Sequence, residues 1–144
     1  MSESNPKFKF SAIVTVRFGD MDAMGHVNNA KYLTYFEEAR LAYYMNLFQY
    51  HAGDVKKLNF ILAEANVKFR SPVKAGERLE AFVRVSEFGT KSFRMEYRVL
   101  NAETRKRVAE GMTVQVMYDY EKGVTIPVPE EFRKKVLEFE QTKA

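Results

Sequence analysis

Apolar and polar residues alternate along most of the second half of the chain. Every second residue is apolar in the segments 60–70, 79–86 and 93–99. This period of two predicts strands that bury one face and leave the other face polar. Turn residues separate the segments, and residues 108–120 are predicted as one more strand, in which Gly111 marks a bend or a bulge.

The first half of the chain follows a different pattern. Residues 30–50 contain neither glycine nor proline, and their apolar positions extend almost all the way round a helix. A helix that is apolar on most faces is typical of a buried position. Residues 7–18 predict a first strand, because they are rich in β-branched and aromatic residues, and residues 20–29 predict a loop. A short amphipathic helix is predicted at residues 130–140, after two prolines.

The predicted order is a strand, a long buried helix, four strands and a terminal helix. This order favours an α+β fold in which a curved antiparallel sheet wraps round one long central helix, within a single domain that spans residues 1–144. One such sheet covers only part of the helix and leaves its edge strands open. We therefore expect a homodimer, with a homotetramer as the larger alternative.

The amino-acid composition and the net charge exclude several classes of function. With 46% hydrophobic and 29% charged residues, the chain is typical of a soluble globular protein. It has no cysteine, which excludes thiolate nucleophiles, disulfides and cysteine-based zinc sites. The net charge of +4 is spread along the chain, which suits a small anionic ligand better than a nucleic acid. We expect a cytoplasmic protein without a membrane or nucleic-acid partner, because neither a secretory signal nor a membrane-spanning apolar stretch is found.

The predicted loop before the long helix is rich in polar and charged side chains. It carries Asp20, Asp22, His26 and the pair Asn28 and Asn29 directly before the helix begins. Free backbone N–H groups and the helix dipole at such a position stabilise developing negative charge. Asp22 can serve as a general base or as a nucleophile. The same residue types are also common in loops and at helix N-caps, so the pattern alone leaves both interpretations open.

One segment carries a family resemblance. Residues 18–32 read FGDMDAMGHVNNAKY, and residues 35–40 read YFEEAR. Together they resemble the signature of hotdog-fold acyl-CoA thioesterases of the 4-hydroxybenzoyl-CoA thioesterase family. Residues 67–73, VKFRSPV, and the turn at residues 89–93, GTKSF, match the same family more weakly. The resemblance runs from residue 8 to about residue 133 and implies the hotdog fold.

The resemblance also implies an activity. Such enzymes hydrolyse an acyl thioester to a free acid and CoA without a metal or cofactor, at sites between the subunits of a dimer or of a tetramer of dimers. Asp22 matches the family's catalytic carboxylate, and Asn29 matches the residue whose backbone N–H stabilises the oxyanion. His26 is a further candidate, either orienting a water molecule or holding the loop. Some relatives carry an Asn between the Asp and the His, where this chain has Met24.

Several residues remain as further candidates. Glu37 and Glu38 are alternatives to Asp22, because other relatives carry a catalytic Glu on the central helix, and Glu64 is a third carboxylate that could reach a partner's site. Asp20 is interpreted as a loop or cap residue. Cationic and hydroxyl side chains near the mouth of the site would bind the phosphates of CoA. The candidates for this substrate-binding role are Arg70, Lys74, Lys91 and Ser92.

Three alternatives to acyl-CoA hydrolysis stay open. The same pocket could hold an acyl thioester without hydrolysing it, or it could take its substrate from an acyl-carrier protein. A nucleic-acid-binding module would instead use aromatic and basic residues on one sheet face, such as Phe82 with Arg84, but it would leave the acidic loop and the buried helix without a role. The sequence does not determine the acyl group.

Overall fold

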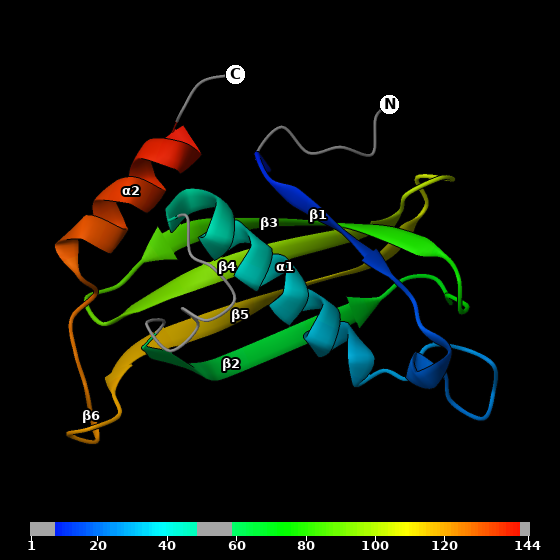
Figure 1. Cartoon of the computed structure of the whole chain (residues 1–144), viewed down its shortest axis with the longest axis horizontal. Coiled ribbons are helices and arrows are strands. Elements are labelled where there is room, and N and C mark those ends of the chain that lie inside the picture. Colours follow the sequence, from blue (N-terminus) through cyan, green and yellow to red (C-terminus); the bar gives the residue numbers. More distant parts are fainter. Residues whose placement is uncertain (1–7, 49–58, 142–144) are drawn as a thin grey trace.

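The fold of the chain is given by a computed structural model that describes residues 8–48 and 59–141 (Figure 1). Within these ranges the chain forms two helices and one sheet, and a short 3-10 turn, Phe18–Asp20, follows the first strand. The helices are α1 (Lys31–Phe48) and α2 (Glu130–Gln141). The strands are β1 (Ser11–Thr15), β2 (Phe60–Phe69), β3 (Arg78–Phe88), β4 (Ser92–Asn101), β5 (Arg107–Asp119) and β6 (Val124–Thr125).

The sheet is antiparallel and curved, and α1 crosses one of its faces (Figure 1). The strands lie in the order β1-β3-β4-β5-β2, and the short β6 pairs with β5. The predicted α+β arrangement of a sheet round one long helix is therefore confirmed. Strand β2 lies at the sheet edge beside β5, although it is the first strand after the helix in sequence.

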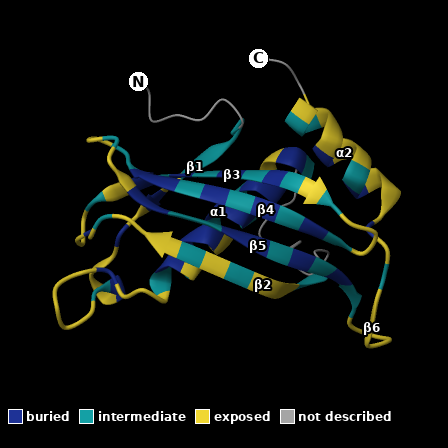
Figure 2. Ribbon diagram, turned by 180° about the vertical axis from the view of Figure 1, so that it is seen from behind, coloured by how far each residue is buried: buried dark blue, intermediate teal, exposed yellow. Residues whose placement is uncertain are grey.

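The core lies between α1 and the inner faces of β3 and β4 (Figure 2). The alternation predicted for these two strands is confirmed, because their inward side chains are all buried. Phe36 of α1 stacks on Tyr97 of β4 with 4.2 Å between the ring centroids. The buried inward residues are Leu79, Ala81, Val83, Val85, Phe93, Met95, Tyr97 and Val99.

Strand β2 is less buried than its alternation predicts. It has no fully buried residue, and Leu62 and Phe69 are about half exposed. The cause is its position, since an edge strand has a neighbour on one side only. A register shift between Leu62 and Glu64 further interrupts the pairing with β5.

Two other expectations need correction. The first strand is shorter than residues 7–18, because the chain turns at the 3-10 segment and leaves Phe18 86% exposed. Gly111 is not a bulge, since its pairing with Val67 and Tyr97 continues without a shift. A Cβ at this position would collide with the carbonyl oxygen of Asn66 and press on the Phe36 ring. The glycine therefore permits close packing of β2 and α1 against β5.

The predicted terminal helix is confirmed as α2, which packs over the end of the sheet where β4 begins. Phe132 contacts Phe93 with 5.1 Å between the ring centroids. Near the end of α2, Glu140 accepts hydrogen bonds from the hydroxyl of Tyr43 at 2.5 Å and from the backbone N–H of Val85 at 3.0 Å. Neither described helix has the length and apolar character needed to cross a membrane.

Candidate active site

The buried residue Asp20 holds the loop before α1 in place. The residue is 3% exposed, and its carboxylate accepts hydrogen bonds from the Tyr35 hydroxyl at 2.7 Å and the Arg17 backbone N–H at 3.1 Å. Lys31 lies 4.0 Å away, and the Asp20 carbonyl accepts the N–H of Asn28 at 2.8 Å. Burial raises the pKa of Asp20, but these hydrogen bonds and the charges of Arg17 and Lys31 outweigh burial and lower the pKa overall. Asp20 thus fixes the loop to the helix.

Asp22 has a different environment, although it lies only two residues further along. It is exposed, and its Oδ1 accepts the backbone N–H groups of Met24 at 2.9 Å and His26 at 3.2 Å. Its own N–H donates to the His26 carbonyl at 2.7 Å. Gly25 has a φ of 83°, which a glycine adopts without strain in so tight a loop. Asp22 closes this loop and still presents a carboxylate to solvent.

The start of α1 leaves one backbone donor unused. The side-chain oxygen of Asn28 accepts the N–H of Ala30 at 2.9 Å, and its carbonyl accepts the N–H of Lys31 at 2.8 Å. The Asn29 carbonyl accepts the N–H of Tyr32 at 3.3 Å. The N–H of Asn29 itself has no acceptor within residues 8–48 and 59–141. It lies where the helix dipole favours negative charge.

A pocket of about 260 Å³ opens beside this donor. It brings together His26, Asn29 and Arg70, three of the predicted site residues, while Asp22 adjoins it through its bonds to the His26 backbone. Arg70 forms an ion pair with Glu110. The pocket, called here the loop pocket, is lined by His26, Val27, Asn29, Tyr32, Phe69, Arg70, Ser71 and Pro72.

Lys74 lies next to the loop but outside the lining of this pocket. Its neighbour Val73 accepts the N–H of Val27 at 3.1 Å, and the Lys74 N–H donates to Glu77 Oε1 at 3.1 Å. Its exposed side chain is therefore at the same end of the molecule as Asp22. Its predicted contact with CoA stays a prediction.

Lys91 and Ser92 lie at the opposite end of the sheet. The Lys91 carbonyl accepts the N–H of Met117, which pairs with the first residue of β2. At the loop pocket, Tyr32 packs instead on Phe69, the last residue of β2, with 5.2 Å between the ring centroids. A strand of this length spans about 30 Å. Within one chain, these two predicted substrate-binding residues are therefore remote from the Asp22 loop.

Glu37, Glu38 and Glu64, the alternative carboxylates, do not line the loop pocket, and their catalytic roles stay predictions. Glu38 accepts a hydrogen bond from Arg17 at 3.3 Å, while Glu37 is exposed on α1 and Glu64 is exposed on β2.

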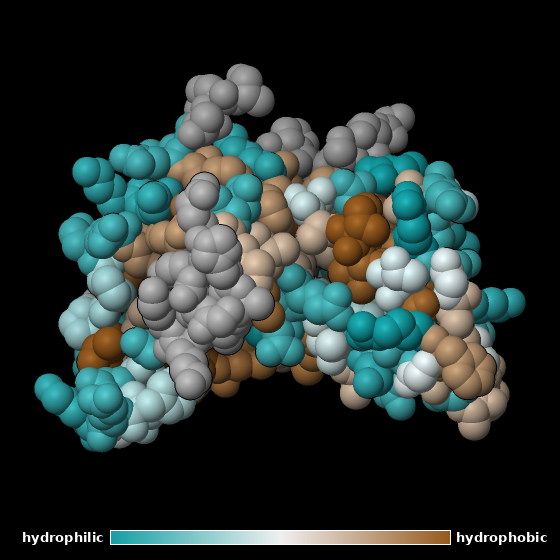
Figure 3. Space-filling view, in the orientation of Figure 1, coloured by the Kyte–Doolittle hydropathy of each residue, from teal (hydrophilic) through white to brown (hydrophobic). Residues whose placement is uncertain are grey.

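Apolar side chains stay exposed on the same face of the molecule as α1 (Figure 3), and Leu33 of α1 is 37% exposed. No group of three metal-ligating side chains occurs among the residues that the structure describes.

Sequence reasoning missed the burial of Asp20 and its bond to Tyr35. The weak signal for it is the pair of cationic residues, Arg17 and Lys31, that flank the loop in the sequence. Both approach the same carboxylate, at 3.8 Å and 4.0 Å. The contact with Tyr35 carries no pattern of its own in a single sequence.

Comparison with known proteins gives a consistent result. The family described as the Thioesterase-like superfamily matches residues 16–136. A crystal structure of a thioesterase from Thermus thermophilus, complexed with coenzyme A and Zn, is 31% identical with a TM-score of 0.82 and covers 94% of this chain and 98% of that chain. The 1,4-dihydroxy-2-naphthoyl-CoA hydrolase of Synechococcus elongatus is 27% identical over 80% of this chain and 85% of that protein.

A Bacillus subtilis relative, the uncharacterised protein YsmA, is 28% identical over 94% of this chain and 90% of its own length. The predicted resemblance to hotdog-fold thioesterases is confirmed by these similarities, and so is the fold. The roles of the individual site residues stay predictions.

Proposed function

Because the chain belongs to the Thioesterase-like superfamily, we propose that it hydrolyses an acyl-CoA thioester to a free acid and CoA. Its enzyme class, thioester hydrolase, follows from the family. The observation that supports the finer proposal is the unused N–H of Asn29, a residue that lines the loop pocket at the N-terminus of α1, next to the carboxylate loop.

The N–H of Asn29 is suited to polarise the thioester carbonyl. Attack on the carbonyl carbon moves charge to its oxygen, and a preorganised donor at a helix N-terminus stabilises that charge. Asn28 holds this geometry, because it caps Ala30 with its side chain and is itself held by the Asp20 carbonyl. The donor thus costs little reorganisation during the reaction.

Asp22 provides the attacking group. Its carboxylate either deprotonates a water molecule that attacks the carbonyl, or attacks directly to form a mixed anhydride that water then cleaves. Both routes need an exposed carboxylate held in one position, which its two backbone hydrogen bonds supply. The thiolate of CoA leaves readily, so no strong general acid is needed. His26 orients the water or holds the loop.

A second copy of the chain would complete the site. Strand β2 is an open edge with Leu62 and Phe69 exposed along it, a surface that favours pairing. If two β2 edges pair antiparallel about a two-fold axis, the first residues of one β2 lie beside the last residues of the other. This arrangement carries Lys91 and Ser92 of the second copy toward the loop pocket, where Arg70 and Lys74 already lie.

A panel of short, medium, long and aromatic acyl-CoA thioesters tests the proposal, with release of the free thiol as the readout. We expect turnover of at least one member by the wild-type protein. Tight binding of the panel without thiol release would contradict hydrolysis and favour a non-hydrolytic binding protein. Turnover of acyl-carrier-protein thioesters alone would replace CoA as the donor.

A further inference from the structure

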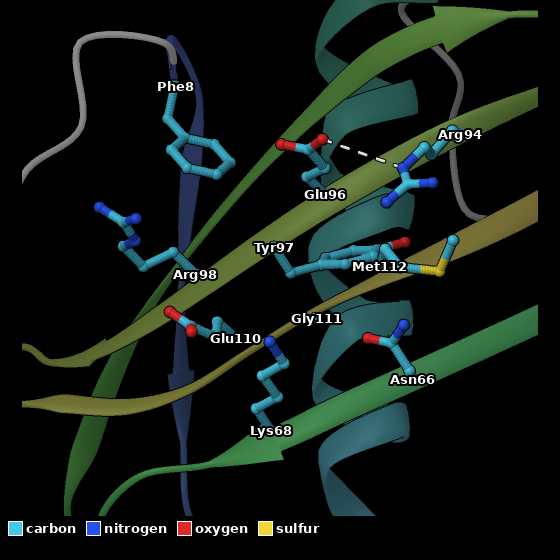
Figure 4. A pocket seen from close by; sticks show the side chains of 10 residues that line it. All are labelled: Phe8, Asn66, Lys68, Arg94, Glu96, Tyr97, Arg98, Glu110, Gly111 and Met112. Atoms are coloured by element: carbon cyan, nitrogen blue, oxygen red, sulfur yellow. Dashed lines mark ion pairs between the residues drawn. The ribbon is translucent and has the colours of Figure 1, made fainter.

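A second pocket lies on the outer face of the sheet, opposite α1 (Figure 4). Its volume is about 380 Å³, larger than the loop pocket, and side chains of β2, β4 and β5 form its walls. Phe8 closes one side ahead of β1. The hydrolysis proposed above makes no use of this outer-face pocket.

Lys68 and Arg98, two cations of the pocket, flank one carboxylate, Glu110. Lys68, Glu110 and Arg98 stand in register on β2, β5 and β4. Glu110 is engaged elsewhere, because it pairs with Arg70 and lies 3.7 Å from Arg107. Within the described ranges neither Lys68 nor Arg98 lies within 4.0 Å of a carboxylate, although the charge of Arg98 contributes to the lowered pKa of Glu110. The buried Nε of Arg98 lacks a hydrogen-bond partner there.

The second carboxylate of the pocket is also neutralised. Glu96 lies 3.0 Å from Arg84 and 3.9 Å from Arg94. Neither carboxylate is therefore left to repel an anion with its full charge, and the cations exceed the carboxylates. Such a site favours a phosphate group, which a guanidinium and an ammonium bind through charge-assisted hydrogen bonds.

The Phe8 ring forms an aromatic wall next to Arg98. The Phe8 ring packs against Phe82 at 6.0 Å, and the guanidinium carbon of Arg98 lies 5.9 Å from the centre of the same ring. Phe8 and the amide of Asn66 are both in the pocket lining. A ring face suits a nucleobase, whose flat surface stacks on it. Asn66 lies across the pocket from this ring, on β2 (Figure 4).

An ion pair near the end of β2 links the linings of the two pockets. Arg70 lines the loop pocket, and its ion-pair partner Glu110 lines the outer-face pocket. Lys68 is on β2, and Arg70 follows directly after the end of that strand. Two residues of extended backbone span about 7 Å. A long ligand with its thioester at Asn29 can therefore follow Arg70 to Lys68.

We propose that the outer-face pocket holds the adenosine 3′-phosphate end of acyl-CoA, with Lys68 and Arg98 on the 3′-phosphate and Phe8 against the base. The assignment rests on the proposed acyl-CoA hydrolysis and deepens it. It also selects between the two donors left open above, because a phosphopantetheine arm on a carrier protein has no nucleotide to place there.

The test compares acyl-CoA with acyl-dephospho-CoA, which lacks only the 3′-phosphate. For the wild type we expect a KM about tenfold higher for the dephospho substrate, the value of one charge-assisted contact. In Lys68→Met and in the double variant with Arg98→Met, the two KM values should converge. The control is Lys122→Met, an exposed lysine on the turn after β5, which should keep the wild-type ratio. Equal KM values in the wild type, or an unchanged ratio in the variants, would overturn the assignment.

Binding of adenosine 3′,5′-bisphosphate, followed by calorimetry, separates this assignment from the proposed function. Binding that is lost in Lys68→Met supports the pocket even if the protein hydrolyses no thioester, in which case the proposed function alone has failed. Absence of binding to the wild type overturns the pocket, even if acyl-CoA is hydrolysed. Binding that depends on Lys68 while the KM ratio does not would make this a separate nucleotide site and also overturn the assignment. The exposed Lys68 can be replaced without disturbing the core, so the single variant remains informative if Arg98→Met fails to fold.

Discussion

Two aspartates at opposite ends of the sheet close their turns in the same way. Asp22 Oδ1 accepts the N–H groups of Met24 and His26, at 2.9 Å and 3.2 Å. Asp119 Oδ1 accepts those of Glu121 and Lys122, at 2.9 Å and 3.0 Å. The Asp22 loop also adjoins the loop pocket and an unused N–H at the start of a long helix, whereas Asp119 closes the turn after β5. Turn closure is thus shared, and the surroundings of Asp22 distinguish the candidate catalyst from a structural residue.

The ends also differ in what stabilises them. At the Asp119 end, α2 covers the sheet with an aromatic cluster centred on Phe132, which is stacked on Phe48 and packed on Phe93. At the Asp22 end, a buried polar contact between Asp20 and Tyr35 supports an exposed loop. We infer that one end contributes stability through packing while the other keeps reactive groups accessible.

The largest effect on stability is expected at the packed end. Phe132→Ala removes a side chain that is 8% exposed and should lower the free energy of unfolding by about 3–5 kcal/mol, the usual cost of such a truncation. Chemical denaturation measures it. Turnover per folded molecule should stay unchanged at low temperature, because Phe132 is remote from the loop pocket. A large fall in turnover of the folded variant would contradict the division between the two ends.

A smaller effect is expected from the support beneath the loop. Tyr35→Phe removes one donor from the buried Asp20 carboxylate and should cost about 1–3 kcal/mol of unfolding free energy at neutral pH. Since the folded pKa of Asp20 is lowered, its stabilisation is present above the unfolded pKa and is lost as the pH falls through the folded value. The difference between Tyr35→Phe and wild type should therefore shrink in acid. A difference that is constant from neutral to acidic pH would show that Asp20 is not the cause.

In a dimer, the Lys91 end of one subunit should lie at the Asp22 end of its partner. Arg70→Ala and Lys91→Ala should each raise the KM for acyl-CoA by about tenfold and leave that of an acyl-pantetheine thioester unchanged. Dimers formed by mixing Asp22→Asn chains with Lys91→Ala chains should regain sites that have both a wild-type kcat and a wild-type KM, because one of the two sites then receives both native residues. Failure to regain such sites after subunit exchange is verified would place Lys91 outside the site.

The smallest effect concerns Glu140 on α2. Burial raises the pKa of Glu140, although hydrogen bonds from Tyr43 and Val85 oppose the rise. A raised folded pKa means that stabilisation is present below the unfolded pKa and is lost as the pH rises through the folded value. Glu140→Gln should remove this decline and differ from the wild type by less than about 1 kcal/mol at neutral pH. Denaturation at several pH values measures the two slopes, and equal slopes would refute the prediction.

The sequence predicted the parts of the fold that rest on local periodicity. The inward faces of β3 and β4, the long helix and the terminal helix all follow from repeats of two or of about 3.6 residues. The position of β2 at the sheet edge does not, because it depends on which strand lies next to it. The packing role of Gly111 could not be predicted for the same reason, since Asn66 and Phe36 approach it from other elements.

The candidate site shows the same limit. A motif of consecutive residues indicated Asp22, His26 and Asn29, and the structure places all three at the start of α1. Lys91 came from a separate motif, whose distance from the loop only the tertiary structure sets. The outer-face pocket has no local signature, because its charged side chains come from three strands.

The central claim is that Asp22 performs chemistry and does more than close a turn. The most direct measurement compares kcat for the best acyl-CoA substrate in Asp22→Asn and Asp119→Asn, with folding checked by circular dichroism. The amide keeps an oxygen acceptor at both turns but cannot act as base or nucleophile. We predict that kcat falls by about 10²–10⁴-fold in Asp22→Asn, with KM little changed, and stays near the wild-type value in Asp119→Asn. A folded Asp22→Asn protein that turns over its thioester at the wild-type rate would contradict the account.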